Sequence, residues 1–242
     1  MIPRADPVAE NQRFYDRLWA TVKLRPPRNF NTWPLLSRLA ASAPMRLEVG
    51  AGMRPRVPIE GTHFVDLSWP AIRALRARGG LAASGEIGAL PYTDRAFDLV
   101  CAFDIVEHVA DDRRALAEIA RVVRPGGTIV LSVPLYMRAW TFFDDLVGHC
   151  RRYEPGALRP LLAAHGLTLD ESAAYGMQPR SELLLKFGVW WFEHHNTHAM
   201  NLYNRVFVPL ALLFQKRLRF APGLVDDPRV DEIVLICRRT LD

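Results

Sequence analysis

Short apolar segments alternate with amphipathic segments along most of the chain, and Pro and Gly separate them. The amphipathic segments 70–78, 112–123 and 155–165 carry apolar residues at helical spacing. The apolar segments have the length of buried strands and lie at 46–49, 63–66, 81–84, 97–103, 128–133, 168–173 and 232–238. This alternation predicts an α/β fold, with an open and mostly parallel sheet covered by helices on both faces.

The clearest helical pattern is in 112–123, where Leu116, Ile119, Ala120 and Val123 recur at steps of three and four residues. We expect this helix to lie with its apolar side on the sheet. The residues that follow it, Arg124-Pro125-Gly126-Gly127, are predicted to end the helix and to turn the chain into the next strand.

Two additions to this pattern are expected. An aromatic-rich segment at 10–40, broken by Pro26-Pro27, is predicted to form two helices over the site. An apolar insertion at 181–220 precedes the last strand, and its uncharged run 206–214 is about half of the ~20 residues that span a bilayer. We therefore expect one domain with an N-terminal helical lid (1–44), a core (45–175), a helical insertion (176–228) and a last strand (229–242).

Composition narrows the possible partners. The net charge is +5 and the pI about 9.4, but basic and acidic residues are interleaved, which is typical of a solvated surface and makes a nucleic-acid partner unexpected. Cys101, Cys150 and Cys237 are far apart, and Cys101 and Cys237 fall in strand-like runs, so no disulfide framework is expected. The polar N-terminus lacks the apolar stretch of a secretory signal, and a reducing cytoplasm fits best.

A glycine bend follows the first predicted strand. Glu48 and Val49 end this strand, and Gly50-Ala51-Gly52 come next. Glycines here let a ligand approach the backbone where a Cβ would collide. A strand followed by two glycines is also a common tight turn, so this bend alone does not identify a cofactor site.

The residues after the bend favour a nucleoside without a pyrophosphate. Pro55 and Pro58 leave little room for the helix whose N-terminus would face a pyrophosphate, and there is no third glycine. The next two strands end near Asp66 and Glu86. Together with Glu48, these carboxylates fall at the carboxyl ends of successive strands, where open α/β sheets bind ligands. Asp66 could accept hydrogen bonds from ribose hydroxyls, and Glu86 one from an adenine amino group.

In combination these motifs resemble the class I S-adenosylmethionine-dependent methyltransferases, in particular the ubiquinone-type and other small-molecule enzymes. The residues that carry the resemblance are 47–52, 85–92, 96–100, 104–109 and 121–127. The resemblance implies a Rossmann-like seven-stranded sheet with six parallel strands and an antiparallel last strand. The proline-broken stretch after Gly52 departs from the family, which usually has a full helix there.

The resemblance also implies where S-adenosylmethionine would lie, with S-adenosylhomocysteine as the product. Glu48 and the bend Gly50-Ala51-Gly52 would meet the methionine part, Asp66 the ribose, and Glu86 with Ile87 the adenine. Phe103 and Asp104 would line the pocket beside the methyl group. Leu67 is a further expected cofactor contact.

Methyl transfer is an in-line displacement, so much of the catalysis can be positioning, helped by a base of near-neutral pKa. Histidine is the obvious type, and His108 and His149 are the two candidates. His108 could instead cap or pack a helix. His149 lies in a stretch that resembles a Gly-His-x-Arg-Arg-Tyr signature flanking the acceptor pocket. Arg151 and Arg152 could hold an anionic acceptor, or pair with Asp144 and Asp145.

We expect no metal. His194 and His198 have a ligand-like spacing, but no second ligand pair accompanies them, and a polar helix end explains them.

The apolar insertion before the last strand gives a clue to the kind of acceptor. Its apolar blocks 183–192 and 206–214 are followed by Lys216, Arg217 and Arg219, so it could be a packed lid, a homodimer contact, or a peripheral attachment to the inner face of the membrane through 183–219. The predicted function is methyl transfer to a small-molecule, lipid-linked or glycan-linked acceptor. The alternatives are a cofactor-binding protein without catalysis and a nicotinamide-dependent reductase.

Overall fold

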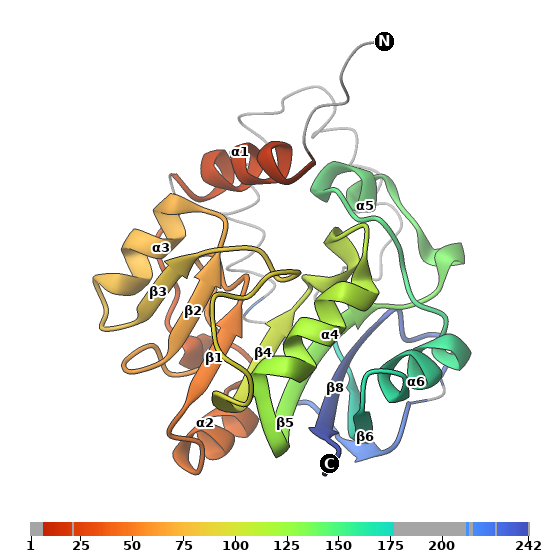
Figure 1. The fold of residues 1–242 in the computed structure, drawn as a ribbon. Helices are drawn as coiled ribbons and strands as arrows, with labels where there is room; N and C mark the ends of the chain where they lie inside the picture. Colours follow the sequence, from red (N-terminus) through yellow and green to blue (C-terminus); the bar gives the residue numbers. More distant parts are fainter. Residues whose placement is uncertain (1–6, 21, 177–211, 213–214, 226, 242) are drawn as a thin grey trace.

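A single open sheet with helices on both faces organises the chain (Figure 1). The computed structural model describes residues 7–20, 22–176, 212, 215–225 and 227–241. Within these residues the sheet has eight strands in the order β3-β2-β1-β4-β5-β8-β6-β7.

The strands are β1 (Arg46–Val49), β2 (His63–Asp66), β3 (Leu81–Ser84), β4 (Phe97–Phe103), β5 (Val123–Pro134), β6 (Leu167–Ala174), β7 (Ala221–Pro222) and β8 (Glu232–Arg239). The α-helices are α1 (Pro7–Trp19), α2 (Trp33–Ala41), α3 (Trp69–Arg76), α4 (Asp112–Val122), α5 (Phe142–Val147) and α6 (Pro155–Ala163). Short 3-10 turns lie at η1 (Pro27–Asn29), η2 (Val106–His108) and η3 (Met137–Ala139).

Strand direction follows the expected pattern. β3, β2, β1, β4 and β5 pair in parallel, and β8 pairs antiparallel with both β5 and β6. β6 therefore runs parallel to β5, which confirms six parallel strands and an antiparallel last strand. The structure adds β7, an edge strand that pairs with Glu171 and Ser172 of β6.

The core has one layer on each face of the sheet. On β4, Val100 and Ala102 pack in a cluster with residues of α4 and α6, whereas Leu99 and Cys101 pack in a cluster with α2 and α3. Side chains alternate between the faces of a strand, so a continuously apolar strand such as β4 can supply both layers. The prediction of helices on both faces is confirmed.

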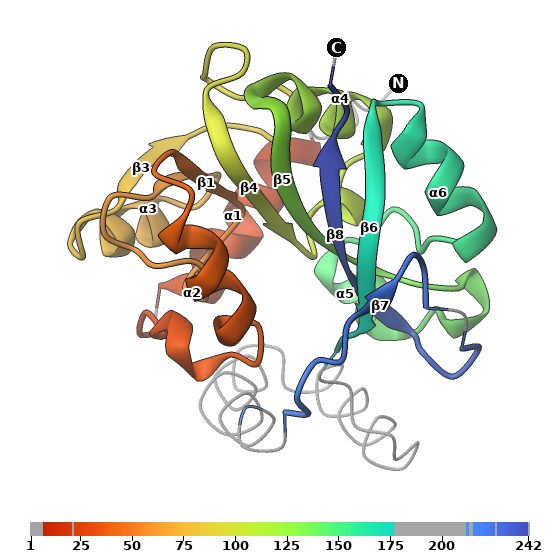
Figure 2. The same cartoon turned by 90° about the horizontal axis from the view of Figure 1, so that it is seen from below.

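The sequence pattern predicted that both N-terminal helices cover the strand ends, but only one of them does. α1 lies across the carboxyl ends of the parallel strands, whereas α2 lies away from that edge (Figures 1 and 2). Leu35 and Leu36 of α2 are buried in the core against one face of the sheet. This apolar side gains more by joining the sheet core than by lining a solvent-facing rim.

The turn predicted at 124–127 is part of β5 instead. α4 ends at Val122, and β5 begins at Val123, opposite Phe97, with a register shift before Leu99. A Cβ on Gly127 would lie 2.6 Å from the Val123 side chain and 2.8 Å from the carbonyl oxygen of Arg124. The glycine pair therefore permits an irregularity inside a strand.

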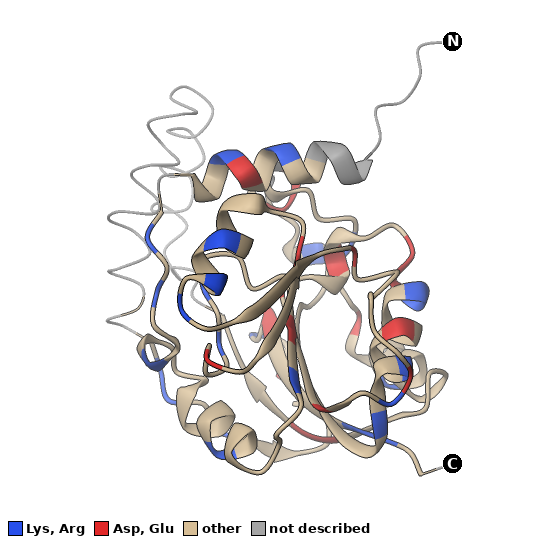
Figure 3. Cartoon of the chain, turned by 60° about the vertical axis from the view of Figure 1, so that its left-hand side comes forward, with Lys and Arg blue, Asp and Glu red and all other residues tan. Residues whose placement is uncertain are grey.

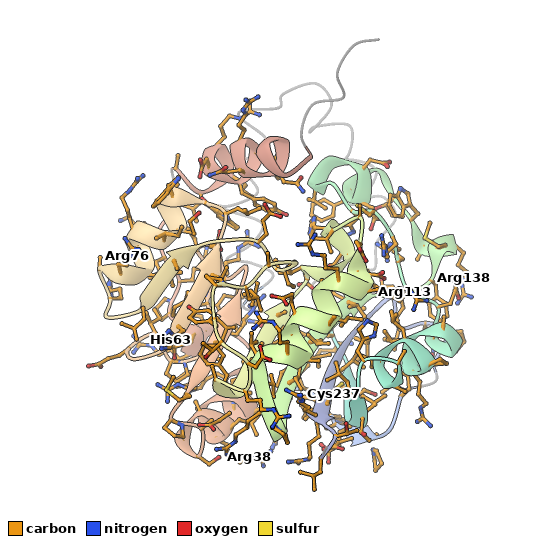
Figure 4. All side chains as sticks on the ribbon, viewed as in Figure 1. Arg38, His63, Arg76, Arg113, Arg138 and Cys237 are labelled. Carbon is orange, nitrogen blue, oxygen red and sulfur yellow. The ribbon has the colours of Figure 1, made fainter. Side chains whose placement is uncertain are left out.

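Along the described ribbon, segments coloured for Lys and Arg are interspersed with segments coloured for Asp and Glu (Figure 3). Arg38, Arg76 and Arg138 lie on separate elements at different edges of the molecule (Figure 4). Cys101, Cys150 and Cys237 are free thiols, and Cys101 and Cys237 are buried in the sheet. Among the described residues, no helix is long and apolar enough to cross a membrane. The apolar block 183–192, most of 206–214, and His194 and His198 lie outside these residues.

Candidate functional site

The glycine bend is the tightest feature at the carboxyl edge of the sheet. Gly50 and Gly52 have φ values of +68° and +53°, a region that side chains other than glycine rarely adopt. A Cβ on Gly50 would overlap the Ile105 side chain, and one on Gly52 would lie 2.8 Å from the Trp19 ring. Both the backbone angles and the neighbours therefore require glycine.

Asp66 ties this bend to the end of β2. Its carboxylate accepts hydrogen bonds of 2.8 Å from the backbone N–H groups of Gly52 and Ser68. Asp66 is buried, and this burial raises the pKa of its carboxyl group. Asp66, the residue predicted to bind the ribose, thus lies beside the glycines, as its place at the end of β2 predicts.

Glu48 shapes the loop that replaces the usual helix. Both carboxylate oxygens of Glu48 accept from the backbone N–H of Arg56 at 3.0 Å. Oε2 also accepts a 3.2 Å hydrogen bond from the backbone N–H of Val57. Burial raises the pKa of Glu48 to about 7. The loop between β1 and β2 contains no helix, as its prolines predicted, and Glu48 holds two of its N–H groups instead.

The third predicted carboxylate behaves differently. Glu86 is exposed just after β3 and forms an isolated bridge with Ala89, whereas Ile87 is buried in the core. The structure therefore buries Glu48 and Asp66 at neighbouring strand ends and leaves Glu86 at the surface. The contacts of all three with a cofactor remain predictions.

Phe103 is the last residue of β4, and Asp104 follows it. Phe103 is buried, and its ring lies 5.7 Å from the guanidinium carbon of Arg56. Asp104 adopts a left-handed φ of +52°, and its backbone N–H donates to Oγ of Ser132, which in turn donates to the Asp104 carboxylate. Left-handed backbone at a non-glycine residue is a strained conformation that gathers at functional sites.

Helix α1 covers the tips of β1 and β2 (Figure 1). The Gln12 side-chain amide donates to the carbonyl oxygen of Leu67 at 3.0 Å, and Asp16 accepts from the Trp69 N–H at 3.0 Å. Trp19 is buried with Met53. The sequence pattern indicated an aromatic lid here, but it did not show that the lid would hold Leu67 and Trp69.

The two candidate histidines meet although they are far apart in the sequence. The rings of His108 and His149 are 4.6 Å apart at 82°. His149 Nδ1 lies 2.8 Å from the Asp144 carboxylate, and its Nε2 lies 3.9 Å from the Glu107 carboxylate. Tyr15 of α1 completes the group, with its hydroxyl 3.4 Å from His108 Nε2.

The buried surroundings affect the protonation of His108 and Glu107 in different ways. Burial and the neighbouring His149 lower the pKa of His108 to about 3, so His108 stays neutral at ordinary pH. Burial raises the pKa of Glu107 well above its usual range. The Asp144 carboxylate lies 2.8 Å from Nδ1 of His149 and so fixes the orientation of the ring, and in a neutral imidazole that donates from Nδ1 it is Nε2 that carries the lone pair.

Sequence analysis missed Glu107, whose side chain is fully buried beside both histidines. Its position directly before His108, just after a predicted strand, was the available signal. A glutamate at the start of a helical segment is usually solvated, so the local sequence does not predict that Glu107 is buried.

The two arginines of the Gly-His-x-Arg-Arg-Tyr stretch are both paired. Arg152 is buried and binds the Asp144 carboxylate through Nε at 2.8 Å and Nη2 at 3.0 Å. Arg151 pairs with Asp112 at 2.6 Å. Pairing with Asp144 is as expected, but pairing with Asp145 is wrong, because Asp145 is exposed and accepts a hydrogen bond from the Trp140 indole.

Comparison with known proteins finds methyltransferases among the similar sequences and folds. A family model described as "Methyltransferase domain" matches residues 55–131. A probable S-adenosylmethionine-dependent methyltransferase of Mycolicibacterium smegmatis is 38% identical over 90 residues, which are 36% of this chain and 35% of that protein. The malonyl-[acyl-carrier protein] O-methyltransferase of Salmonella typhimurium is 34% identical over 89 residues, 34% of this chain and 36% of that protein. The matches thus span about a third of each of these relatives.

The fold agrees with this sequence likeness. An S-adenosylmethionine-dependent methyltransferase of Thermotoga maritima superimposes with a TM-score of 0.58 at 15% identity, covering 95% of this chain and all of the other. The cofactor of such enzymes is S-adenosylmethionine. The matched family model and the sequence relatives support membership of the class I S-adenosylmethionine-dependent methyltransferase family, and the solved structure agrees with its fold.

Proposed function

We propose that the protein transfers the methyl group of S-adenosylmethionine to an oxygen or nitrogen of a small-molecule, lipid-linked or glycan-linked acceptor. The observation that carries the proposal is the bend at Gly50 and Gly52 locked to the buried Asp66. This bend suits a nucleoside that brings no pyrophosphate, because no helix N-terminus follows it.

The chain's own residues divide the work. Gly50, Gly52 and Asp66 hold the nucleoside and the methionine part, while Phe103 and Asp104 line the side from which the acceptor approaches. Since Trp19 and Ile105 lie against the two glycines, their side chains must shift when the cofactor enters. S-adenosylmethionine supplies an electrophilic methyl group, and alignment with the acceptor gives most of the rate.

His149 acts on the acceptor side. Its Nδ1 is held by Asp144, so Nε2 is oriented and can bind the acceptor or take its proton. The Salmonella relative is named for methylating malonyl groups on an acyl carrier. That acceptor class supports a carboxyl or hydroxyl oxygen on a carrier or lipid as the group to be methylated.

A transfer assay with methyl-labelled S-adenosylmethionine and cell extract tests the proposal, followed by mass identification of the labelled product. We expect label in a small or lipid-extractable product, and less of that label with Asp66→Ala. Cofactor binding without any turnover would instead favour the non-catalytic alternative. Calorimetric binding of a nicotinamide dinucleotide in place of S-adenosylhomocysteine would overturn the assignment.

Attachment to a membrane surface through 183–219 is the second part of this proposal. Its support is the basic group Lys216, Arg217 and Arg219 next to apolar sequence. Co-sedimentation with anionic liposomes should fall when these three residues are replaced by Glu. The absence of any co-sedimentation by the unmodified chain would remove this part and leave the methyl-transfer proposal intact.

A further inference from the structure

Glu107 is a buried acid without a hydrogen-bond partner. Its side chain is 0% exposed, and neither carboxylate oxygen accepts a hydrogen bond within the described part of the chain. Its ion-pair contact there is His149 Nε2 at 3.9 Å. Buried polar groups in folded proteins are almost always satisfied, so an exception such as this one calls for a ligand, an ion or water.

Two imidazoles face the same point. One carboxylate oxygen of Glu107 and one ring nitrogen each of His108 and His149 lie within 4.8 Å of one another. Ligand atoms that share one transition-metal ion at about 2.1 Å lie roughly 3 to 4 Å apart. Side-chain rotations that move each of these atoms by less than about 1 Å would therefore bring all three within bonding distance of one ion.

The surroundings of His149 are those of a metal ligand. Its Nδ1 binds Asp144, and Asp144 is itself held by two hydrogen bonds from Arg152. In metal sites the second nitrogen of a ligating histidine typically binds a carboxylate, which fixes the ring and raises its affinity. Among the described contacts, Arg152 pairs with the Asp144 carboxylate and not with Glu107.

We propose that Glu107, His108 and His149 form a binding site for one divalent transition-metal ion, of the zinc or manganese type, at the carboxyl edge of the sheet beyond β4. Two imidazoles and one carboxylate are a set that suits such ions better than calcium or magnesium, which prefer oxygen ligands. Three protein ligands leave positions open for water or an acceptor oxygen. A coordinated His149 cannot take a proton, so the ion would act on the acceptor in its place.

The site is tested by metal binding alone, independently of methyl transfer. The full chain is stripped with a chelator and dialysed against Zn²⁺ or Mn²⁺, and the bound metal is measured by elemental analysis. All proteins carry the His194→Ala and His198→Ala replacements, so that this second histidine group does not contribute. We expect one ion per chain.

The variants Glu107→Gln and His149→Ala should each weaken binding at least tenfold. Glu107→Gln keeps the shape of the side chain and removes a buried charge, so it is expected to fold, as circular dichroism would verify. His165→Ala is the matched control, because His165 Nδ1 bonds to the Leu161 carbonyl oxygen and lies outside the group. This control should bind metal as the parent does.

Two results would overturn the proposal. One is a parent protein that retains no metal after exposure to either ion. The other is a folded Glu107→Gln variant that binds metal with the parent's affinity. Loss of methyl transfer with intact metal binding would count against the proposed function and not against this site.

Discussion

His149 Nδ1 and Oδ1 of Asp144 lie 2.8 Å apart, and Nε of Arg152 donates to the same oxygen at 2.8 Å. The three residues come from α5 and the loop after it, so a local sequence builds a buried charged unit. This unit positions His149 for either role, as a base or as a metal ligand.

The replacement Asp144→Asn should destabilise the fold by about 3 kcal/mol or more, because Arg152 would keep a buried charge without its partner. Denaturant unfolding of the variant and the parent measures this difference. Asp145→Asn is the control, since it makes the same change at an exposed neighbour on the same helix. The buried pair would lose its stabilising role if both variants shifted the unfolding midpoint equally.

Asp66→Ala should weaken the binding of S-adenosylhomocysteine more than tenfold, or about 1.4 kcal/mol. The variant loses the expected ribose acceptor and frees the Gly52 and Ser68 N–H groups that shape the bend. Titration calorimetry measures the affinity, and Asp94→Ala, at an exposed carboxylate, is the control. Unchanged affinity in Asp66→Ala would mean that the cofactor lies elsewhere.

The glycine bend gives a prediction about backbone strain. Gly52→Ala should cost about 1 to 2 kcal/mol from the left-handed φ alone, and more from the contact with the Trp19 ring. Adding Trp19→Ala should remove the contact part of this penalty but not the backbone part. Thermal or denaturant unfolding of the single and double variants separates the two contributions.

Gly156→Ala is the control for this comparison. Gly156 lies in the first turn of α6 at a φ outside the left-handed region, and a Cβ there meets no atom within 4 Å. Alanine at this position should be neutral or stabilise by up to about 1 kcal/mol. A Gly52→Ala variant as stable as Gly156→Ala would contradict the described bend.

Most of the sheet could be predicted because buried parallel strands leave continuous apolar runs in the sequence. β1 to β4 have the predicted bounds for this reason. β7 was missed because two residues carry no periodicity. The start of β5 was placed too late, since Pro125-Gly126-Gly127 has the composition of a turn, and only its pairing with the start of β4 makes it a strand.

The candidate site was predictable where function depends on backbone and strand ends, as at Gly50, Gly52 and Asp66. It was not predictable where burial comes from distant chain segments. The Cys150 N–H donates to the Glu107 carbonyl oxygen at 2.7 Å, so the loop that carries His149 lies directly on the turn that carries Glu107. Nothing in the local sequence around Glu107 indicates that contact.

The buried Glu48 makes stability depend on pH. Its pKa rises from an ordinary 4.5 to about 7 in the folded chain, mainly because burial disfavours the charged form. The folded state therefore holds a proton that the unfolded state has lost between these pH values, and the contribution of Glu48 to stability falls as pH rises through this window. Above about pH 7 the full penalty is reached, at most roughly 3 kcal/mol.

Glu48→Gln removes this titration, because an amide stays neutral. We expect the stability of the parent relative to Glu48→Gln to decline between pH 4.5 and pH 7 and to level off above it. Denaturant unfolding of both proteins across this range measures the difference, and other buried acids cancel because both proteins contain them. Gln can still accept from the Arg56 and Val57 N–H groups through its single oxygen, so any loss of hydrogen bonding is constant with pH. A difference that stays flat from pH 4.5 to pH 8 would show that Glu48 titrates normally, and hence that it is not the buried anchor of the loop after the glycine bend.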